Sequence, residues 1–219
     1  MIKKSFKISI IDYKISNLKS VKNALSYLGF ENIITSDSNE ILKSDGVILP
    51  GVGSFPHGML NLKELSLIES INKFILSGKP LIGICLGMQL LFDKSFEFKS
   101  TDGLGVIAGE VKNFKTKNRL CKTPHVGWNK IILNKYITNE NKKFNPFKNL
   151  NHEKNLFYFV HSFFSLPKNK DNILTETTYN NINFCSSVLQ KNVFATQFHL
   201  EKSGENGLEI LKNFFNYFR

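Results

Sequence analysis

Cysteine is scarce in this 219-residue sequence: there are three, widely spaced and without a Cys-x-x-Cys pair. A disulfide framework and a metal site are therefore not expected, and a reducing, cytoplasmic location is predicted. No apolar stretch approaches the ~20 residues needed to cross a bilayer. The first residues contain only a strand-length apolar run and no small-residue cleavage site, so neither a membrane span nor a signal peptide is expected.

Arginine is nearly absent, with Arg119 and Arg219 the only two among 29 basic residues, against 18 acidic ones and a net charge of +11. A basic chain suggests nucleic-acid binding, but arginine is the residue favoured for bidentate phosphate and guanine contacts. The lysines are dispersed along the chain, beside 25 asparagines. A solvated lysine surface without a nucleic-acid partner is the favoured interpretation. The alternative, a lysine-driven nucleic-acid binder, predicts steeply salt-dependent DNA binding.

The first half of the chain alternates strand-like and helix-like segments, in a sequence that is 42% hydrophobic and long enough for a core. Short apolar strands are expected at 7–12, 32–35, 46–49 and 79–84. Helical segments are expected at 17–29, within 55–76 and at 86–92. In the first of these, Asn17 is the expected N-cap and Gly29 the C-terminal stop. Strands separated by helices imply a mostly parallel sheet with helices on both faces.

After Asp93 the sequence becomes rich in short, turn-bounded β segments. They are expected at 106–114, 128–133, 157–164, 183–189 and 193–198, and helical periodicity returns at 204–218. The polar segment 136–154 is expected to be a loop with one helical turn at 146–150. We therefore predict a single α/β domain over residues 1–219, with an open, mostly parallel central sheet flanked by helices and an antiparallel β extension.

Cys85 is the candidate nucleophile. It ends an apolar strand and precedes a helix-like segment, with Gly83 and Gly87 on either side. This Gly-x-nucleophile-x-Gly elbow holds the reactive residue on a tight turn that small flanking residues allow to close. The start of the helix also favours the thiolate. A buried structural cysteine is the alternative, and it is the favoured interpretation for Cys121 and Cys185, which lack such a context.

A thiolate that expels an amine needs an acid/base partner, usually a histidine oriented by a carboxylate. His199 follows a β-rich run, and Glu201 comes two residues later. Residues i and i+2 of an extended segment point the same way, so Glu201 is expected to reach the imidazole. His161 is the rival base, although no Asp or Glu lies within three residues of it. His57 and His152 are expected on the surface.

The sequence LPGVGSF at 49–55 follows an apolar strand. Gly51 and Gly53, on either side of Val52, allow a backbone that presents N–H groups to a developing oxyanion. The segment is expected at the carboxyl edge of the sheet, where open α/β sheets bind ligands. A plain strand-to-helix turn is an equally good interpretation of this segment alone.

Three segments together resemble the class I, or triad-type, glutamine amidotransferases: PGVGSF at 50–55, GICLGMQLL at 83–91 and TQFHLEKSG at 196–204. Three more are similar to the glutaminase subunits of imidazole glycerol phosphate synthase, a histidine-pathway enzyme: GLGVIAGEV at 103–111, KTPHVGWN at 122–129 and FYFVHSFF at 157–164. The resemblance runs from residue 10 to the terminal helix. It implies a flavodoxin-like α/β fold and hydrolysis of L-glutamine to glutamate and ammonia without a cofactor.

The resemblance also implies a role for each matching residue. Cys85 would attack the glutamine side-chain amide, and His199, oriented by Glu201, would act as base and then as acid. The oxyanion-hole donors would be Leu86 and, after a peptide rearrangement, Val52 or Gly53. Glutamine would be held by Gln89, Glu97 and the backbone of His161, Ser162 and Phe163. The positions matching the partner interface are Asp12, Asn17, Trp128 and Tyr158.

The partner implied by the resemblance is a (β/α)8-barrel cyclase/synthase subunit, which forms a heterodimer with the glutaminase and receives ammonia through a tunnel. The resemblance further implies that the isolated subunit is nearly inactive until the synthase ligand binds. The chain departs from the family pattern at Leu200, where proline is usual, and at Lys14 and Ser16, where glycines are usual. Two alternatives stay open: a paralogous subunit that supplies another acceptor such as a sugar, and a scaffolding pseudo-amidotransferase, against which the complete triad argues.

Overall fold

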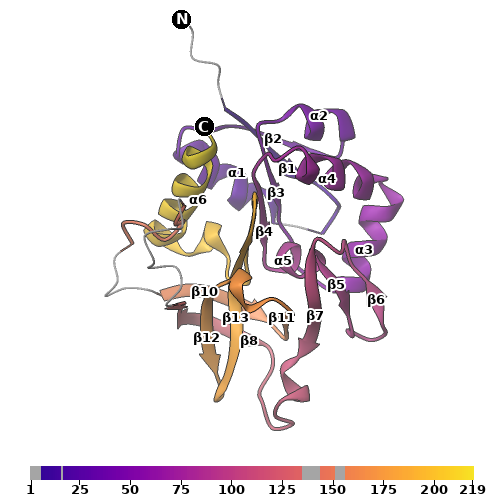
Figure 1. Cartoon of the computed structure of the whole chain (residues 1–219), viewed down its shortest axis with the longest axis vertical. Helices are drawn as coiled ribbons and strands as arrows, with labels where there is room; N and C mark the ends of the chain where they lie inside the picture. The colour runs from indigo at the N-terminus through magenta and orange to yellow at the C-terminus, as the bar shows by residue number, and fades with distance from the viewer. Residues whose placement is uncertain (1–5, 16, 135–143, 151–155) are drawn as a thin grey trace, which may run out of the picture.

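Helices cover both faces of a central sheet, as Figure 1 shows. The structure is a computed structural model, and it describes residues 6–15, 17–134, 144–150 and 156–219. Within these residues, the buried apolar side chains form two clusters, and both draw on the central strands. Ile8 and Ile10 belong to one cluster and Ile11 to the other, so the first strand is apolar on both faces. Burial on both faces explains why the central strands are short, continuous apolar runs.

The parallel part of the sheet has the strand order β2-β1-β3-β4-β14, and all of these neighbours are parallel. Its strands are β1 (Lys7–Ile11), β2 (Glu31–Thr35), β3 (Gly46–Leu49), β4 (Leu81–Ile84) and β14 (Val193–Thr196). Each lies where a strand was predicted. The carboxyl ends of β3, β4 and β14 therefore meet at one edge of the sheet, and the loops that follow these strands come together there.

Helices of the described chain lie against both faces of the parallel strands. On one face are α1 (Leu18–Tyr27) and α6 (Gly204–Phe218); on the other are α2 (Ser38–Lys43), α3 (Phe55–Glu64), α4 (Leu67–Leu76) and the short α5 (Leu86–Leu90). The predicted helical segment 55–76 is thus two helices, because Ser66 adopts a left-handed conformation (φ 55°) between them. Asn17 occupies the N-cap position of α1, but its side chain makes no capping hydrogen bond within the described chain.

The extension continues the same sheet from β14 through β13, β11 and β7 to β5 and β6; its pairs are antiparallel except that of β7 with β5, which is parallel. These strands are β13 (Ile182–Gln190), β11 (Phe163–Pro167), β7 (Ile107–Asn113), β5 (Phe92–Ser95) and β6 (Thr101–Asp102), with β12 (Ile173–Tyr179) and β9 (Ile132–Leu133) paired at the side. A separate antiparallel ribbon joins β8 (His125–Lys130) to β10 (Leu156–His161). The predicted fold class, a mostly parallel α/β sheet with an antiparallel extension, is confirmed.

Several boundaries differ from the prediction. The helix expected at 86–92 is the shorter α5 (Leu86–Leu90), because Phe92 begins β5 and pairs with Ile107. The segments 128–133 and 157–164 each hold two strands, and α2, β5, β6 and β12 were not predicted. The turn expected at 146–150 is present, but most of the surrounding loop lies outside the described residues.

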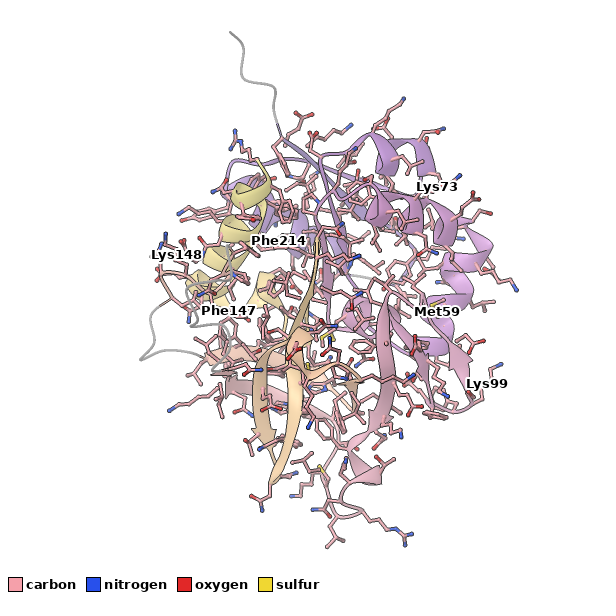
Figure 2. The ribbon with its side chains drawn as sticks, in the orientation of Figure 1. Met59, Lys73, Lys99, Phe147, Lys148 and Phe214 are labelled. Atoms are coloured by element: carbon pink, nitrogen blue, oxygen red, sulfur yellow. The ribbon has the colours of Figure 1, made fainter. Side chains whose placement is uncertain are left out.

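Most lysines of the described chain are exposed. Figure 2 shows Lys73, Lys99 and Lys148 on its outer surface, and all three are exposed. Phe147 and Phe214, labelled in the same view, are buried. The charge is thus carried outside an aromatic core, as expected for a solvated lysine surface. No helix in the described residues is long and apolar enough to cross a membrane.

Candidate active site

Cys85 lies on the turn between β4 and α5, in the strand-turn-helix arrangement expected for an elbow. Its backbone has φ 54° and ψ −107°, a conformation that side chains other than glycine rarely adopt. The Cys85 N–H donates to the carbonyl of Thr196 at 2.7 Å, which ties the elbow to the end of β14. A Cβ on Gly87 would overlap the carbonyl of Leu49, so the flanking glycine is needed for the turn to pack.

His199 and Glu201 are in direct contact. The Nδ1 atom of His199 lies 2.8 Å from Oε1 of Glu201, and the side chains are only 2% and 3% exposed. The predicted contact is present in a different local structure: His199 is the N-cap of a 3₁₀ turn, η5 (Leu200–Lys202), and Glu201 lies within that turn. The His199 N–H donates to the carbonyl of Tyr158 at 2.9 Å, and the Ser203 hydroxyl donates to the carbonyl of His199 at 2.5 Å. The imidazole therefore projects from a backbone that is fixed on both sides.

The protonation of His199 is governed by its two neighbours. Burial lowers the pKa of His199, but the interactions with Cys85, followed by those with Glu201, raise this pKa to about 10. Imidazolium is therefore the favoured form at neutral pH, facing the cysteine sulfur. The Nε2 atom of His199 is buried, and no described residue meets it with the geometry of a hydrogen bond in this conformation.

His161 is unsuited to the role of base. Burial lowers the pKa of His161 to about 3 and the pKa of His125 to about 4. The two rings contact each other, with 3.0 Å between Nδ1 of His125 and Nε2 of His161. His161 Nδ1 also lies 2.7 Å from the carbonyl of Phe163. The pair is therefore neutral near pH 7, and of the two candidate bases only His199 is paired with a carboxylate.

A cavity of about 280 Å³ opens beside Cys85. It brings together all the residues predicted for the oxyanion hole and for glutamine binding: Val52, Gly53, Leu86, Gln89, Glu97, His161, Ser162 and Phe163. Pro124 and Val160 also line it and were not predicted, because neither carries a polar side chain. A larger hollow of about 480 Å³ lies beside α3, and its lining, which includes Met59 and Lys99 (labelled in Figure 2), contains no cysteine. Convergent polar groups make the smaller cavity the candidate site.

Two polar side chains in the cavity have fixed positions. Gln89 Nε2 donates to the carbonyl of Phe163 and to Oε1 of Gln197, at 3.0 Å in each case. Glu97 Oε2 accepts from the N–H of Phe55 at 2.7 Å, at the start of α3. Burial raises the pKa of Glu97 and that hydrogen bond opposes the rise. The cavity thus offers an amide and a carboxylate to a polar ligand.

The expected oxyanion donors do not converge in this conformation. The Leu86 N–H donates to the carbonyl of Gly51 at 3.3 Å, and the Val52 N–H donates to the carbonyl of Ile15 at 3.2 Å. The N–H of Leu86, which an oxyanion would need as a donor, is therefore already bonded to the Gly51 carbonyl. Gly53, with φ 103°, lies in the same loop, which follows β3. An oxyanion hole at this place requires the rearrangement of the 51–53 backbone that the family resemblance implied.

The residues predicted near a partner lie on the surface of the ribbon and on the loop after β1. Trp128 pairs with Tyr158 across the ribbon, with 6.1 Å between ring centroids. Trp128 is 55% exposed and Val126, on the same side of β8, is 56% exposed. Asp12 is half-buried and Asn17 is exposed. The exposed apolar side chains form a patch of the kind that marks interaction sites.

The positions that depart from the family pattern differ in their surroundings. Lys14 has φ 71°, the left-handed conformation that favours the usual glycine. Ser16 lies outside the described residues. Leu200 is fully buried in the core, and the contact between His199 and Glu201 is intact beside it.

The other histidines and cysteines stand apart from the site. Cys121 and Cys185 are buried and free, and burial raises the pKa of Cys185 far above its ordinary range. His57 is exposed, and His152 lies outside the described residues. Among the described residues, no group of three or more His, Cys, Asp or Glu side chains is arranged to hold a metal ion.

A sequence model of the glutamine amidotransferase class-I family matches residues 9–217, and the chain therefore belongs to this family. It is similar to the imidazole glycerol phosphate synthase subunit HisH of a Bacillus cereus strain, with 45% identity over 208 residues that cover 94% of this chain and 93% of the relative. It is equally similar to the subunit of the same name from Pyrococcus furiosus, with 45% identity over 210 residues, 95% of this chain and 97% of the relative. The resemblance drawn from the sequence is confirmed.

Solved structures share the fold at low identity. PurLQS from Thermotoga maritima matches with a TM-score of 0.68 and 22% identity, covering 98% of this chain and 100% of that one. A putative GMP synthase protein from Thermoplasma acidophilum matches with a TM-score of 0.66 and 20% identity, covering 98% and 94%. These matches show the α/β fold alone.

Proposed function

We propose that the chain is the glutaminase subunit of an imidazole glycerol phosphate synthase, and that it hydrolyses L-glutamine to glutamate and ammonia for histidine biosynthesis. The observation that carries the proposal is the cavity of about 280 Å³, which is lined by Cys85 on its strained elbow and by Gln89 and Glu97. His199, whose pKa is raised by Cys85, is in contact with Glu201. The HisH relatives, aligned over nearly the whole chain, supply the pathway.

The reaction follows from the protonation states of the pair. The Cys85 sulfur attacks the side-chain amide carbon of glutamine, and the C–N bond breaks as the imidazolium of His199 gives its Nε2 proton to the leaving amine. Ammonia departs and a thioester remains. A water then attacks the thioester carbon while the neutral imidazole takes its proton. The C–S bond breaks, glutamate leaves and the starting pair is restored.

Glutamine is held by groups whose hydrogen bonding is already partly used. Both amide protons of Gln89 are engaged, one by Phe163 and one by Gln197, which leaves Oε1 of Gln89 to accept from the ligand. Glu97 lines the cavity and suits the α-ammonium group. The backbone of 161–163 completes the binding surface.

We infer that the conformation described is the resting one. Because the Gly51 carbonyl accepts from Leu86, the tetrahedral intermediate lacks its donors until the 51–53 backbone turns over. The hydrogen bond from the Val52 N–H to the carbonyl of Ile15 joins the 51–53 segment to the loop after β1, which carries Asp12 and Asn17. A partner that contacts this loop is thereby coupled to the 51–53 backbone.

The proposed partner is a (β/α)8-barrel cyclase/synthase subunit that forms a heterodimer with this chain. The exposed side chains of Val126 and Trp128, with the half-buried Tyr158 paired to Trp128, support an interface on the β8–β10 ribbon. Ammonium is not nucleophilic, so delivery through a tunnel in the complex protects the product from protonation. We take residues 1–219 as one domain in the cytoplasm, because β1 and β14, near the two ends of the described chain, belong to the same sheet.

The test is glutamine hydrolysis by the chain, alone and with the organism's histidine-pathway cyclase, with and without the cyclase ligand. We expect low activity alone, strong activation in the liganded complex and glutamine-dependent turnover of the cyclase substrate. Activity without such turnover would identify a different ammonia acceptor. A glutamine-like electrophile that leaves Cys85 of the complex unmodified would identify a pseudo-enzyme.

A further inference from the structure

Gln197 is a fully buried polar residue that directly follows β14. Its N–H donates to the carbonyl of Ser186 at 2.9 Å, which fixes the backbone. Its side chain points to the nucleophile, with Nε2 3.6 Å from the sulfur of Cys85. Neither the elbow nor the contact between His199 and Glu201 requires an amide at this position.

The orientation of the Gln197 amide can be worked out from its neighbours. A backbone carbonyl only accepts hydrogen bonds, so the group of Gln89 that contacts the carbonyl of Phe163 must be the NH₂. The same NH₂ contacts Gln197 at 3.0 Å, and the Gln197 atom that faces it must therefore be the oxygen. The NH₂ of Gln197 is then directed at Cys85, as a donor to the sulfur.

The carbonyl of Phe163, on which this orientation depends, is itself fixed from the other side. It lies 2.7 Å from Nδ1 of His161, and a carbonyl needs that nitrogen to be the donor. Nε2 of His161 then accepts a hydrogen bond from the N–H at Nδ1 of His125, with 3.0 Å between the two nitrogens. Nε2 of His125 in turn accepts from the amide of Asn129 at 3.2 Å. Donor and acceptor are therefore assigned for every hydrogen bond in the series that leads from Asn129 to the Cys85 sulfur.

We propose that Gln197 is a further catalytic residue, which stabilises the Cys85 thiolate by donating an amide hydrogen bond to it. The inference rests on the proposed glutaminase function for its place in the reaction. The sulfur also lies 3.8 Å from the carbonyl of Val160, which can accept only from a thiol. When the proton leaves, that partner is lost and the Gln197 amide remains as a neutral donor. A donor to the charged form favours that form.

The test is the pH dependence of Cys85 alkylation by iodoacetamide, followed on the Cys85 peptide by mass spectrometry. Gln197→Met removes the donor at similar volume, and Gln197→Glu replaces it with an acceptor. We expect the alkylation midpoint to rise by about one pH unit in Gln197→Met, corresponding to about a tenfold loss of thiolate, and by more in Gln197→Glu. In the liganded complex, kcat should fall about tenfold with KM for glutamine changed less than threefold.

Gln190→Met is the matched control, because Gln190 is a β13 residue that donates to the carbonyl of Val106 at 2.7 Å, away from the cavity. It should leave the midpoint unchanged. A midpoint for Gln197→Met within 0.2 units, roughly, of this control would overturn the proposal, because hydrogen bonds to charged groups shift it by more. Alkylation needs no glutaminase activity, so an inactive complex whose midpoint still responds to Gln197 would refute only the proposed function.

A measurement on the unsubstituted chain covers variants that fail to fold. The chain has three glutamines, Gln89, Gln190 and Gln197. With ¹⁵N-labelled glutamine side chains, the Gln197 NH₂ resonances should move as Cys85 titrates, while those of Gln190 stay in place. Gln197 resonances that do not respond would overturn the proposal.

Discussion

Replacing Glu201 by glutamine isolates the carboxylate of the proposed triad. The substitution keeps the shape of the side chain and removes its charge. Glu201 lies 2.8 Å from Nδ1 of His199 in surroundings where both side chains are almost fully buried. Burial lowers the pKa of His199, the interactions with Cys85 raise it, and those with Glu201 raise it further. The neutral amide should therefore lower the pKa of His199 and weaken the hydrogen bond that orients its imidazole ring.

The size of the effect follows from the burial of the pair. A hydrogen bond to a charged group contributes about 1.5–3 kcal/mol, which corresponds to about a 10- to 150-fold change in rate. Solvent screening reduces this little, because the two side chains are 2% and 3% exposed. We expect kcat of Glu201→Gln to fall within that range. KM should change little, because Glu201 does not line the cavity.

The assay is glutamine hydrolysis by the liganded complex, with Cys85 alkylation followed in parallel against pH. Glu205→Gln is the control, since Glu205 lies exposed in the first turn of α6 and should leave both readouts unchanged. Circular dichroism establishes that the variants fold. A fall in kcat of less than about threefold, with the alkylation profile unmoved, would refute the assignment of Glu201 as the group that orients His199.

Three further predictions concern stability. Lys14→Gly should raise the free energy of unfolding in urea by about 1 kcal/mol, because Lys14 has φ 71°; a loss of stability would show that the side chain matters more than the strain. Gly87→Ala should lower Tm by roughly 3–10 °C, because the added Cβ overlaps the carbonyl of Leu49; an unchanged Tm would contradict this. His125 and His161 have folded pKa values of about 4 and about 3, so the unfolded chain takes up their protons first. Stability in urea should therefore fall as pH drops from about 6.5 toward 4, by about 1.4 kcal/mol per pH unit for each imidazole, and a flat profile would refute their burial as neutral rings.

The features that were predictable from sequence depend on neighbours along the chain. The elbow needs only a strand, a helix and glycines within two residues of Cys85. The contact between His199 and Glu201 spans two residues, so it survives although the segment is a turn. Apolar runs located the parallel strands for the same reason, since each is buried on both faces. These signals are local, and local conformation was enough to find them.

The features that were missed depend on register between distant segments. His125 faces His161 only because β8 and β10 pair in the register that places them opposite each other, 36 positions apart. The amide of Gln197 meets Cys85 across 112 positions. α5 ends at Leu90 because Phe92 pairs with β7, which no helical pattern could indicate. Such contacts are settled by packing of the whole sheet.

The orientation of the 51–53 backbone is determined neither by the local sequence pattern nor by packing alone. The hydrogen bond from Leu86 to the Gly51 carbonyl is neutral and 3.3 Å long, and such bonds contribute about 0.5–1.5 kcal/mol net. A resting preference of that size is about a 2- to 13-fold ratio of populations. A partner therefore needs only a comparable difference in affinity between the two backbone orientations to reverse it. A Cβ on Gly51 would overlap the Tyr13 hydroxyl, so this strand tolerates no side chain there in the resting orientation. A weakly held peptide beside a glycine, linked through Val52 to the loop after β1, is thus the structural basis that we propose for activation by the partner.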